Sequence, residues 1–262
     1  RCADYLKEIK VEGLQTVWFQ DLGNKSYRQV WQYQEYLLQQ TVAVKRANRG
    51  TTSPQKTQNH LLFVEHPHVF TLGKSGKQEH LLAAPQVLQQ LEAEFVKTNR
   101  GGDITYHGPG QLVGYPILDL ENFFTDVHKY LRLLEEVIIL TLDAYGLKGT
   151  RSAGETGVWL DTQTPFARKI CAMGIRASRW VSMHGFALNA NVDLTYFDAI
   201  IPCGIRNKAV TSLQKELGHP IDMEALKKIV KQNFEKIFDV QIQPLSDGAS
   251  KFETELWRQQ GK

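Results

Sequence analysis

Two kinds of hydrophobic pattern run along the chain, one typical of short strands and one typical of amphipathic helices. Strict alternation of apolar and polar residues, or a short apolar run between turn residues, predicts a strand. Residues 169–176 and 181–189 form two such runs in close succession, which favours a β-hairpin. Further strands are predicted at residues 15–22, 61–67, 69–73, 94–98, 112–118 and 156–160.

Apolar residues that recur about every 3.6 positions predict three long helices. The first covers residues 27–48, the second begins at the capping residue Asp126 and ends near Gly146, and the third runs from Asp222 to about Phe238. A shorter helix is expected at residues 85–91. Strands and helices are interspersed without internal repeats or linkers. We therefore expect a single α+β domain over residues 1–262, with a mixed, mostly antiparallel sheet and flanking helices.

Glycine is densest between two predicted strands, at residues 100–117, which read RGGDITYHGPGQLVGYPI. Glycine adopts backbone angles that other residues resist, and clustered glycines let a ligand approach the main chain. The stretch lacks a Gly-Lys-Ser/Thr ending and no helix follows it, so it is neither a Walker A nor a dinucleotide-binding loop. Arg100 and His107 are its two side chains that could hold or polarise a polar group. The alternative is a purely structural double turn.

The amino-acid composition indicates the general class of protein but does not identify its function. A chain of 262 residues with 42% hydrophobic and 23% charged residues is ordinary for a globular protein and needs no disulfide to hold its core. The net charge of +3 is too small to argue for nucleic acid, and it is compatible with an acidic protein partner. No apolar run reaches about 18 residues, so no membrane span is expected. Three cysteines without CxxC spacing predict reduced thiols and a cytoplasmic location.

One of these cysteines has a setting that suits chemistry. Cys203 lies between Pro202 and Gly204, where a tight turn would project the thiol and leave backbone N–H groups nearby. A neighbouring cation would lower the pKa of the thiol and so activate it. The candidate partners are Lys169, His107, His184 and Arg206. The alternative is a small buried hydrophobic residue, and this second interpretation is favoured for Cys171, which has apolar neighbours in a predicted strand.

Lys169 stands at the start of that same apolar strand. If it is buried there, its pKa falls and it can act as a base near neutral pH. The alternative is an exposed lysine at the end of a strand. A second candidate, the histidine pair His66 and His68, has a spacing that suggests metal, but no further ligand lies nearby in the sequence. We therefore expect two loop histidines there and no metal site.

Several of these segments, in this order, resemble the lipoyl(octanoyl) transferase family. The resemblance extends over about residues 15–240, and the Arg-Gly-Gly to His-Gly-Pro-Gly-Gln run together with Pro-Cys-Gly is highly specific. Beside residues 100–117, the matching segments are 65–67, 71–73, 156–159, 169–174, 183–189, 202–205 and 210–213.

The resemblance implies a fold shared with lipoate and biotin protein ligases, and an acyltransferase activity. The enzyme would transfer an octanoyl group, carried on the phosphopantetheine of acyl carrier protein, to a lysine of lipoyl domains in lipoate biosynthesis. The acceptors would be E2 subunits of 2-oxoacid dehydrogenases and the glycine cleavage H protein. No other cofactor, no metal, no nucleic acid and no membrane would take part.

The resemblance also implies residue roles. Cys203 would form the acyl-thioester intermediate, and Lys169 would lower its pKa and act as acid and base. A basic cluster would face the acidic carrier protein; it consists of Arg168, Lys169, Arg176, Arg179, Arg206 and Lys208. The acyl site would be lined by Arg100, Gly101, Gly102, Asp103, Ile104, Thr105, Tyr106, His107, Ala172, Met173, Gly174, Gly185, Phe186 and Ala187.

Two alternatives stay open at this point. An ATP-dependent lipoate ligase or a lipoyl amidotransferase of the same fold is one. A ligase would release AMP and would not need Cys203, and an amidotransferase would take its acyl group from a modified protein. The other is a non-catalytic module that binds an acyl group or nucleic acid through the basic cluster, and it would keep its full function after Cys203→Ala and Lys169→Ala.

Overall fold

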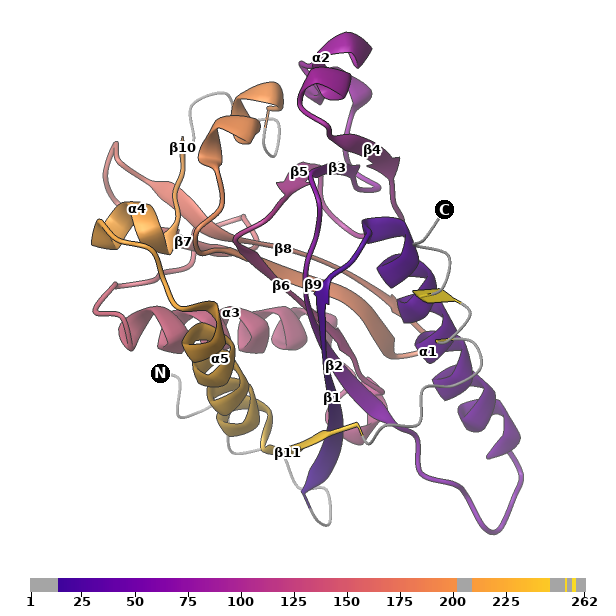
Figure 1. Cartoon of the computed structure of the whole chain (residues 1–262). Coiled ribbons are helices and arrows are strands. Elements are labelled where there is room, and N and C mark those ends of the chain that lie inside the picture. The colour runs from indigo at the N-terminus through magenta and orange to yellow at the C-terminus, as the bar shows by residue number, and fades with distance from the viewer. Residues whose placement is uncertain (1–13, 202–208, 246–252, 254–255, 258–262) are drawn as a thin grey trace.

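A mixed sheet forms the centre of the computed structural model, which describes residues 14–201, 209–245, 253, 256 and 257 (Figure 1). Its central neighbours are antiparallel, whereas the strands at both edges pair in parallel, which agrees with the predicted sheet. The strands in spatial order are β10 (Ala209–Val210), β8 (Arg168–Ser178), β9 (Val181–Asn189), β6 (Gln111–Ile117), β2 (Asn59–Glu65), β1 (Gln15–Asn24) and β11 (Val240–Pro244), and β7 (Val158–Leu160) pairs with β8.

A smaller sheet lies beside the main one and carries part of the Gly-rich stretch (Figure 1). Its strands in order are β4 (Glu94–Lys97), β3 (Val69–Leu72) and β5 (Ile104–His107). The sequence analysis did not predict strand β5, whose four residues lie between two glycine-rich turns. Pairing with β3 makes this part of the stretch a strand.

The three long predicted helices are confirmed as α1 (Tyr27–Ala47), α3 (Val127–Asp143) and α5 (Met223–Phe238). Each begins at a side chain that accepts a backbone N–H of its first turn, and Asp126 and Asp222 do so as predicted. Two short helices, α2 (Pro85–Gln90) and α4 (Leu213–Leu217), lie in connections. In the described part of the chain, no helix combines the length and apolarity needed to cross a membrane.

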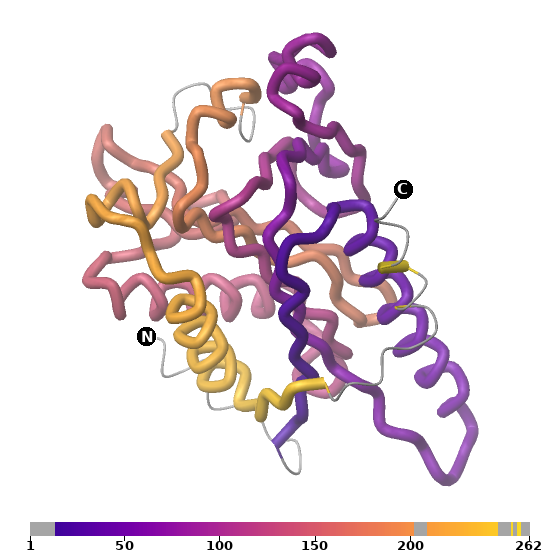
Figure 2. Tube along the Cα trace, in the orientation of Figure 1, coloured from indigo at the N-terminus to yellow at the C-terminus, as the bar shows by residue number. Residues whose placement is uncertain are grey.

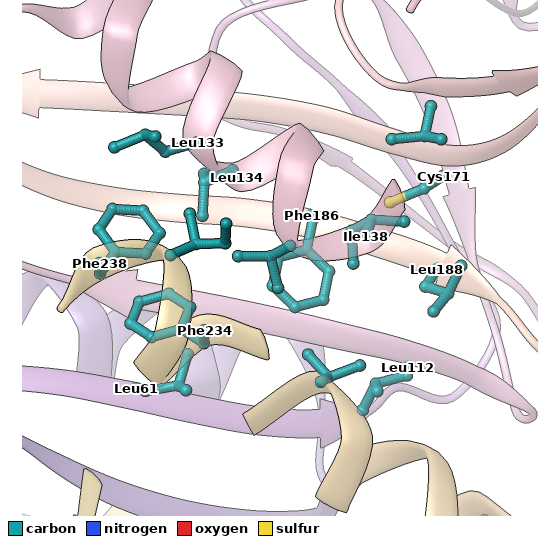
Figure 3. Packing of buried hydrophobic residues seen from close by; sticks show 14 of the residues in the cluster. Leu61, Leu112, Leu133, Leu134, Ile138, Cys171, Phe186, Leu188, Phe234 and Phe238 are labelled. Carbon is teal, nitrogen blue, oxygen red and sulfur yellow. The ribbon is translucent and has the colours of Figure 1, made fainter. Parts of the chain in front are cut away.

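Alternate residues of the central strands enter two different hydrophobic cores. Leu61 and Phe63 of β2 pack with α3 and α5, whereas Leu62 and Val64 pack with α1 on the opposite face of the sheet. Figure 3 shows the first core, where the stacked rings of Phe234 and Phe238 lie 4.4 Å apart. The sheet is therefore packed on both faces, and its strands β8 and β9 form part of the site described below.

The last described strand returns to the first one. β11 follows α5 and pairs in parallel with β1, and Val240 lies opposite Gln15 (Figure 2). The sequence analysis did not predict β11. The main sheet is thus closed at this edge by residues more than two hundred positions apart.

Candidate active site

A cavity of about 670 Å³ lies where the Gly-rich stretch covers strands β6, β8 and β9. It is lined by Lys169 and by nearly every residue expected in the acyl site. These residues are Arg100, Gly101, Gly102, Asp103, Ile104, Thr105, His107, Ala172, Met173, Gly174, Gly185, Phe186 and Ala187. The structure thus brings together three segments that are separate in the sequence.

Tyr106 is the exception among them. Side chains alternate along β5, so Thr105 and His107 line the cavity while the Tyr106 ring lies on the other side. There its hydroxyl bonds His68 Nδ1 at 2.7 Å, and its ring stacks on Tyr196. The Tyr106 side chain therefore does not line this cavity, because it packs in a hydrophobic cluster with Phe70 and Phe197.

Small residues form the floor of the cavity. Ala172 of β8 lies directly opposite Ala187 of β9, and Gly174 lies opposite Gly185. Directly opposed residues of an antiparallel pair share one face of the sheet. The alanine pair leaves room that larger side chains would fill, whereas at the glycine pair the backbone of Gly101 and Gly114 takes the place of a side chain.

Gly174 also allows the Gly-rich stretch to lie directly on β8. The backbone N–H of Gly101 donates to the carbonyl oxygen of Ile175 at 2.8 Å. A Cβ at Gly174 would lie 2.6 Å from the carbonyl oxygen of Gly101, which is closer than real contacts allow. Gly102 follows with a φ of +83°, a conformation that favours glycine.

Arg100 places a positive charge in the wall of the cavity. The side chain is only 7% exposed, and its guanidinium donates to Thr71 O at 2.7 Å, to Thr71 Oγ1 at 2.9 Å and to Gly101 O at 3.0 Å. These contacts fix the plane of the guanidinium against strand β3. The charge also lowers the pKa of nearby His184, where it adds to the larger effect of burial.

Three buried histidines close to this charge are neutral near pH 7. Burial lowers the pKa of His66 to about 4, that of His184 to about 3, and that of His107 well below its ordinary value. His107 Nδ1 donates to Gln111 Oε1 at 2.7 Å, because the amide nitrogen of Gln111 itself donates to Tyr106 O and Asn189 Oδ1.

The histidine pair of the sequence analysis has separate partners. His66 bonds the carbonyl oxygen of Lys25 and the hydroxyl of Tyr115, whereas His68 bonds the hydroxyl of Tyr106. His66 lies in the connection between β2 and β3, as predicted, and it is fully buried there. Among the residues that the structure describes, no group of three or more His, Cys, Asp or Glu side chains could hold a metal ion.

Lys169 is half-buried at the cavity wall. Its exposure is thus intermediate between the buried lysine and the exposed lysine that were considered from the sequence. Its Nζ lies 4.6 Å from the centroid of the Trp159 ring, which is a cation–π distance. Its carbonyl oxygen accepts the N–H of Thr211 at 2.9 Å, next to the pairing of β10 with β8. The ammonium group is therefore placed at the edge of the cavity by contacts on both sides.

Cys171 is buried in the core, as favoured from the sequence. It packs with Ile138 and Leu188, and burial raises the pKa of its thiol (Figure 3). In the pairing of β7 with β8, Trp159 lies opposite Lys169 but Val158 lies opposite Cys171, so β8 has one extra residue there. Lys169 lines the cavity beyond this bulge, and Cys171 does not.

Cys203 lies outside the residues that the structure describes, as do Arg206 and Lys208 of the expected basic cluster. Two other members of that cluster are engaged in ion pairs. Arg168 forms a two-bond pair with Glu216, with both distances 2.6 Å, and Arg176 donates to Glu35 at 2.6 Å. The carboxylates come from distant helices, which the sequence alone could not bring beside these arginines.

The cavity also contains residues that the sequence analysis did not select. Gln111 and Tyr115 lie within the Gly-rich stretch itself and could have been chosen for their polarity. Tyr27 opens helix α1 and Asn189 closes β9, and no local pattern marks either of them as part of a site. The other residues of this kind are Ser75, Val113, Val127, Leu131, Gly154, Glu155, Thr156, Ile175, Phe197 and Val210.

Sequence comparison finds close relatives over nearly their whole length. The octanoyltransferase of Flavobacterium psychrophilum is 63% identical over 225 residues, which are 86% of this chain and 97% of the relative. The octanoyltransferase of Cytophaga hutchinsonii is 53% identical over 231 residues, 87% of this chain and 95% of the relative.

Comparison with solved structures confirms the lipoate-ligase fold. A lipoate-protein ligase A bound with ATP superposes with a TM-score of 0.65 over 94% of both chains at 13% identity. A bipartite lipoate protein ligase from Thermoplasma acidophilum gives a TM-score of 0.64 over 95% of this chain and 92% of that one at 15% identity. Residues 26–235 match the family model described as the lipoyl protein ligase A/B catalytic domain, and the chain belongs to that family.

Proposed function

We propose that this chain is an octanoyltransferase of protein lipoylation. It takes an octanoyl group from the thioester of octanoyl-acyl carrier protein and transfers it to the side-chain amine of a lysine in a lipoyl domain. The observation that carries the proposal is the 63% identity to a protein named octanoyltransferase, over 97% of that relative. The cavity that gathers the expected acyl-site residues supports it.

The donor determines which cofactors are needed. A thioester is already an activated acyl group, so forming an amide from it is energetically downhill. The reaction therefore requires no ATP and no cofactor beyond the pantetheine that carries the octanoyl group. This requirement separates the transferase from an ATP-dependent lipoate ligase.

The proposed reaction has two halves. In the first, the sulfur of Cys203 bonds the octanoyl carbon, the bond to the pantetheine sulfur breaks, and Lys169 passes the proton of the Cys203 thiol to the leaving thiolate. In the second, the acceptor lysine nitrogen bonds the same carbon and the bond to Cys203 breaks. Lys169 takes one proton from the amine and returns it to Cys203. The net change is one thioester converted to one amide.

The geometry of the described residues suits these steps. Lys169 stands at the wall of the cavity, so a proton can be exchanged with groups that enter it. The Ala172–Ala187 pair leaves space for an acyl chain on the face of the sheet. The proposed acceptors are lipoyl domains of E2 subunits of 2-oxoacid dehydrogenases and the glycine cleavage H protein. The proposed location is the cytoplasm, an inference that rests on the sparse cysteines of the sequence.

Mass spectrometry tests the proposal directly. The purified protein is mixed with octanoyl-acyl carrier protein without ATP, and intact and peptide masses are recorded. We expect an octanoyl adduct on Cys203 that disappears when a lipoyl domain is added. Cys171→Ala is the matched control and keeps the adduct, whereas Cys203→Ala loses it.

Two outcomes would contradict the proposal in different ways. An adduct on Cys171 would preserve the chemistry and overturn the assignment of the nucleophile. An unmodified protein that octanoylates the lipoyl domain only with ATP and free octanoate would make the chain a ligase.

A further inference from the structure

His184 has an unusual backbone conformation for a residue inside a strand. Its φ is +60°, although it lies in the middle of β9 and has a side chain. This region of backbone space disfavours residues with a Cβ, and such outliers persist where the surroundings hold them in place. The contacts that hold His184 therefore indicate what the conformation achieves.

On the side away from β8, the backbone of His184 is held by a helix rather than by a strand. The register of β9 with β6 ends at Phe186 and Gly114, before His184 is reached. The N–H of His184 donates instead to the side-chain oxygen of Gln34 in α1, at 2.8 Å. Gln34 is fully buried, so this contact is made in the interior of the protein.

The ring of His184 is oriented by a chain of three polar side chains. His184 Nε2 bonds Asn99 Oδ1 at 2.7 Å, and the Asn99 amide nitrogen donates to Glu35 Oε1 at 2.8 Å. The same carboxylate accepts from Arg176 at 2.6 Å. Because the Asn99 amide nitrogen is used on Glu35, its oxygen faces the ring and Nε2 carries the hydrogen.

His184 and its neighbour across the sheet fasten both sides of Arg100. Ile175 lies directly opposite His184 in the pairing of β8 with β9. Ile175 O accepts the N–H of Gly101, while His184 holds the side chain of Asn99. The residues before and after Arg100 are thus tied to one point on the cavity floor.

We propose that His184 is a positioning residue that acts through Asn99 to fix the start of the Gly-rich stretch, and with it the Arg100 side chain, against the cavity. The part of this inference that concerns the reaction rests on the proposed octanoyl transfer. Loss of the His184–Asn99 bond lets residues 99–102 lift from β8. Arg100 then meets the acyl donor in the wrong place, which weakens donor binding more than it slows the chemical steps.

The main test variant is His184→Gly. Glycine accepts a positive φ without strain, so this change removes the ring and keeps the backbone conformation. Asn99→Ala breaks the same bond from the other side, and His128→Ala, an exposed histidine of α3, serves as control. The double variant of His184→Gly and Asn99→Ala asks whether the two residues act through one bond.

Two measurements are made on each variant. The first is hydrogen exchange of the peptide that covers residues 99–104, which needs no activity. We expect its amides to exchange about tenfold faster than in the wild type in both His184→Gly and Asn99→Ala. The double variant should exchange at the same rate as either single variant, because both changes break one bond. The second is the KM for octanoyl-acyl carrier protein, which we expect to rise about tenfold while kcat changes by less than about twofold.

Added imidazole separates positioning from simple filling of space. Imidazole can enter the hole left by His184→Gly and restore the N–H donor to Asn99, so both exchange protection and KM should recover. Thiophene has a similar size and no N–H, and it should restore neither. Unchanged exchange at residues 99–104, equal rescue by thiophene, or a loss of kcat at constant KM would overturn the inference. If the wild-type protein formed no octanoyl adduct, the proposed function would fail, and the exchange data would still decide the role of His184.

Discussion

At the scale of single residues, the cavity keeps its polar groups in fixed protonation states by different means. His66 and His184 are kept neutral by burial, which lowers the pKa of each. Arg100 carries a guanidinium, which stays charged in proteins, and its N–H groups donate to carbonyl and hydroxyl oxygens of Thr71 and Gly101. Lys169 stands at the cavity edge over an aromatic ring. Lys169 also lines the cavity, which is where the proposed proton transfers take place.

The role of Lys169 can be tested by Lys169→Ala. Removing the group that moves the proton should slow formation of the octanoyl-enzyme by about 10²–10⁴-fold, the usual size of general acid–base catalysis. Rapid mixing with octanoyl-acyl carrier protein and quenched mass spectrometry measures the rate. Lys148→Ala, an exposed lysine after α3, is the control and should react as the wild type does. A wild-type rate in Lys169→Ala would remove the residue from the mechanism.

At the scale of elements, the site depends on how closely the Gly-rich stretch lies on β8. The distance is set by Gly174, since an added Cβ there would meet Gly101 O at 2.6 Å. One partner of this contact is the backbone carbonyl of Gly101, and the other is a Cβ whose position is fixed by the backbone of β8. The strain cannot be relieved by turning a side chain, and one element must move.

Gly174→Ala should therefore separate the stretch from β8. We expect the free energy of unfolding to fall by about 1–3 kcal/mol, as in other overpacked positions, and binding of the octanoyl donor to weaken further. Urea unfolding and the KM for the donor measure the two effects. Ala177→Gly, at an exposed position of the same strand, controls for general changes in strand propensity and should leave KM unchanged. Unaltered KM in Gly174→Ala would mean that the contact does not shape the site.

The same scale shows what could be predicted from the sequence. The long helices could be predicted because caps such as Asp126 and Asp222 and the 3.6-residue period are local signals. Strands β5, β10 and β11 were not predicted, and each is defined by its pairing with a strand that is distant in the sequence. The predicted acyl-site segments do line the cavity, since their motifs are contiguous in sequence. Tyr27 and Asn189 could not be found, because only the folded chain brings them there.

At the scale of the whole molecule, the buried histidines make stability depend on pH. The folded-state pKa of His60, His66 and His184 lies at about 3 to 4, below the value of about 6.5 for an unfolded chain. Between these values the unfolded state binds more protons than the folded state. The stability that these groups confer is therefore fully present above about pH 6.5 and is lost as the pH falls toward the folded-state pKa.

Urea unfolding from about pH 7.5 down to about pH 4.5, followed by tryptophan fluorescence, tests this expectation. The free energy of unfolding should fall as the pH is lowered, and His66 alone should contribute a loss on the order of 2–3 kcal/mol by about pH 4.5. His66→Gln, which cannot take up a proton, should show a smaller dependence on pH than the wild type. Identical slopes in the two proteins would show that His66 does not remain neutral in the folded state.

The buried thiol of Cys171 is a built-in reporter of how often the core opens. Its sulfur lies among Ile138, Leu188 and the other apolar groups between β8 and α3 (Figure 3). An alkylating reagent must reach the sulfur and needs it as a thiolate. Burial blocks the reagent from the sulfur, and it also raises the pKa of the thiol, which disfavours the thiolate. Cys171 therefore becomes labelled only when β8 and α3 separate. The rate of its alkylation, read by mass spectrometry of the peptide that contains Cys171, reports how often this part of the native protein opens, and no mutation is needed.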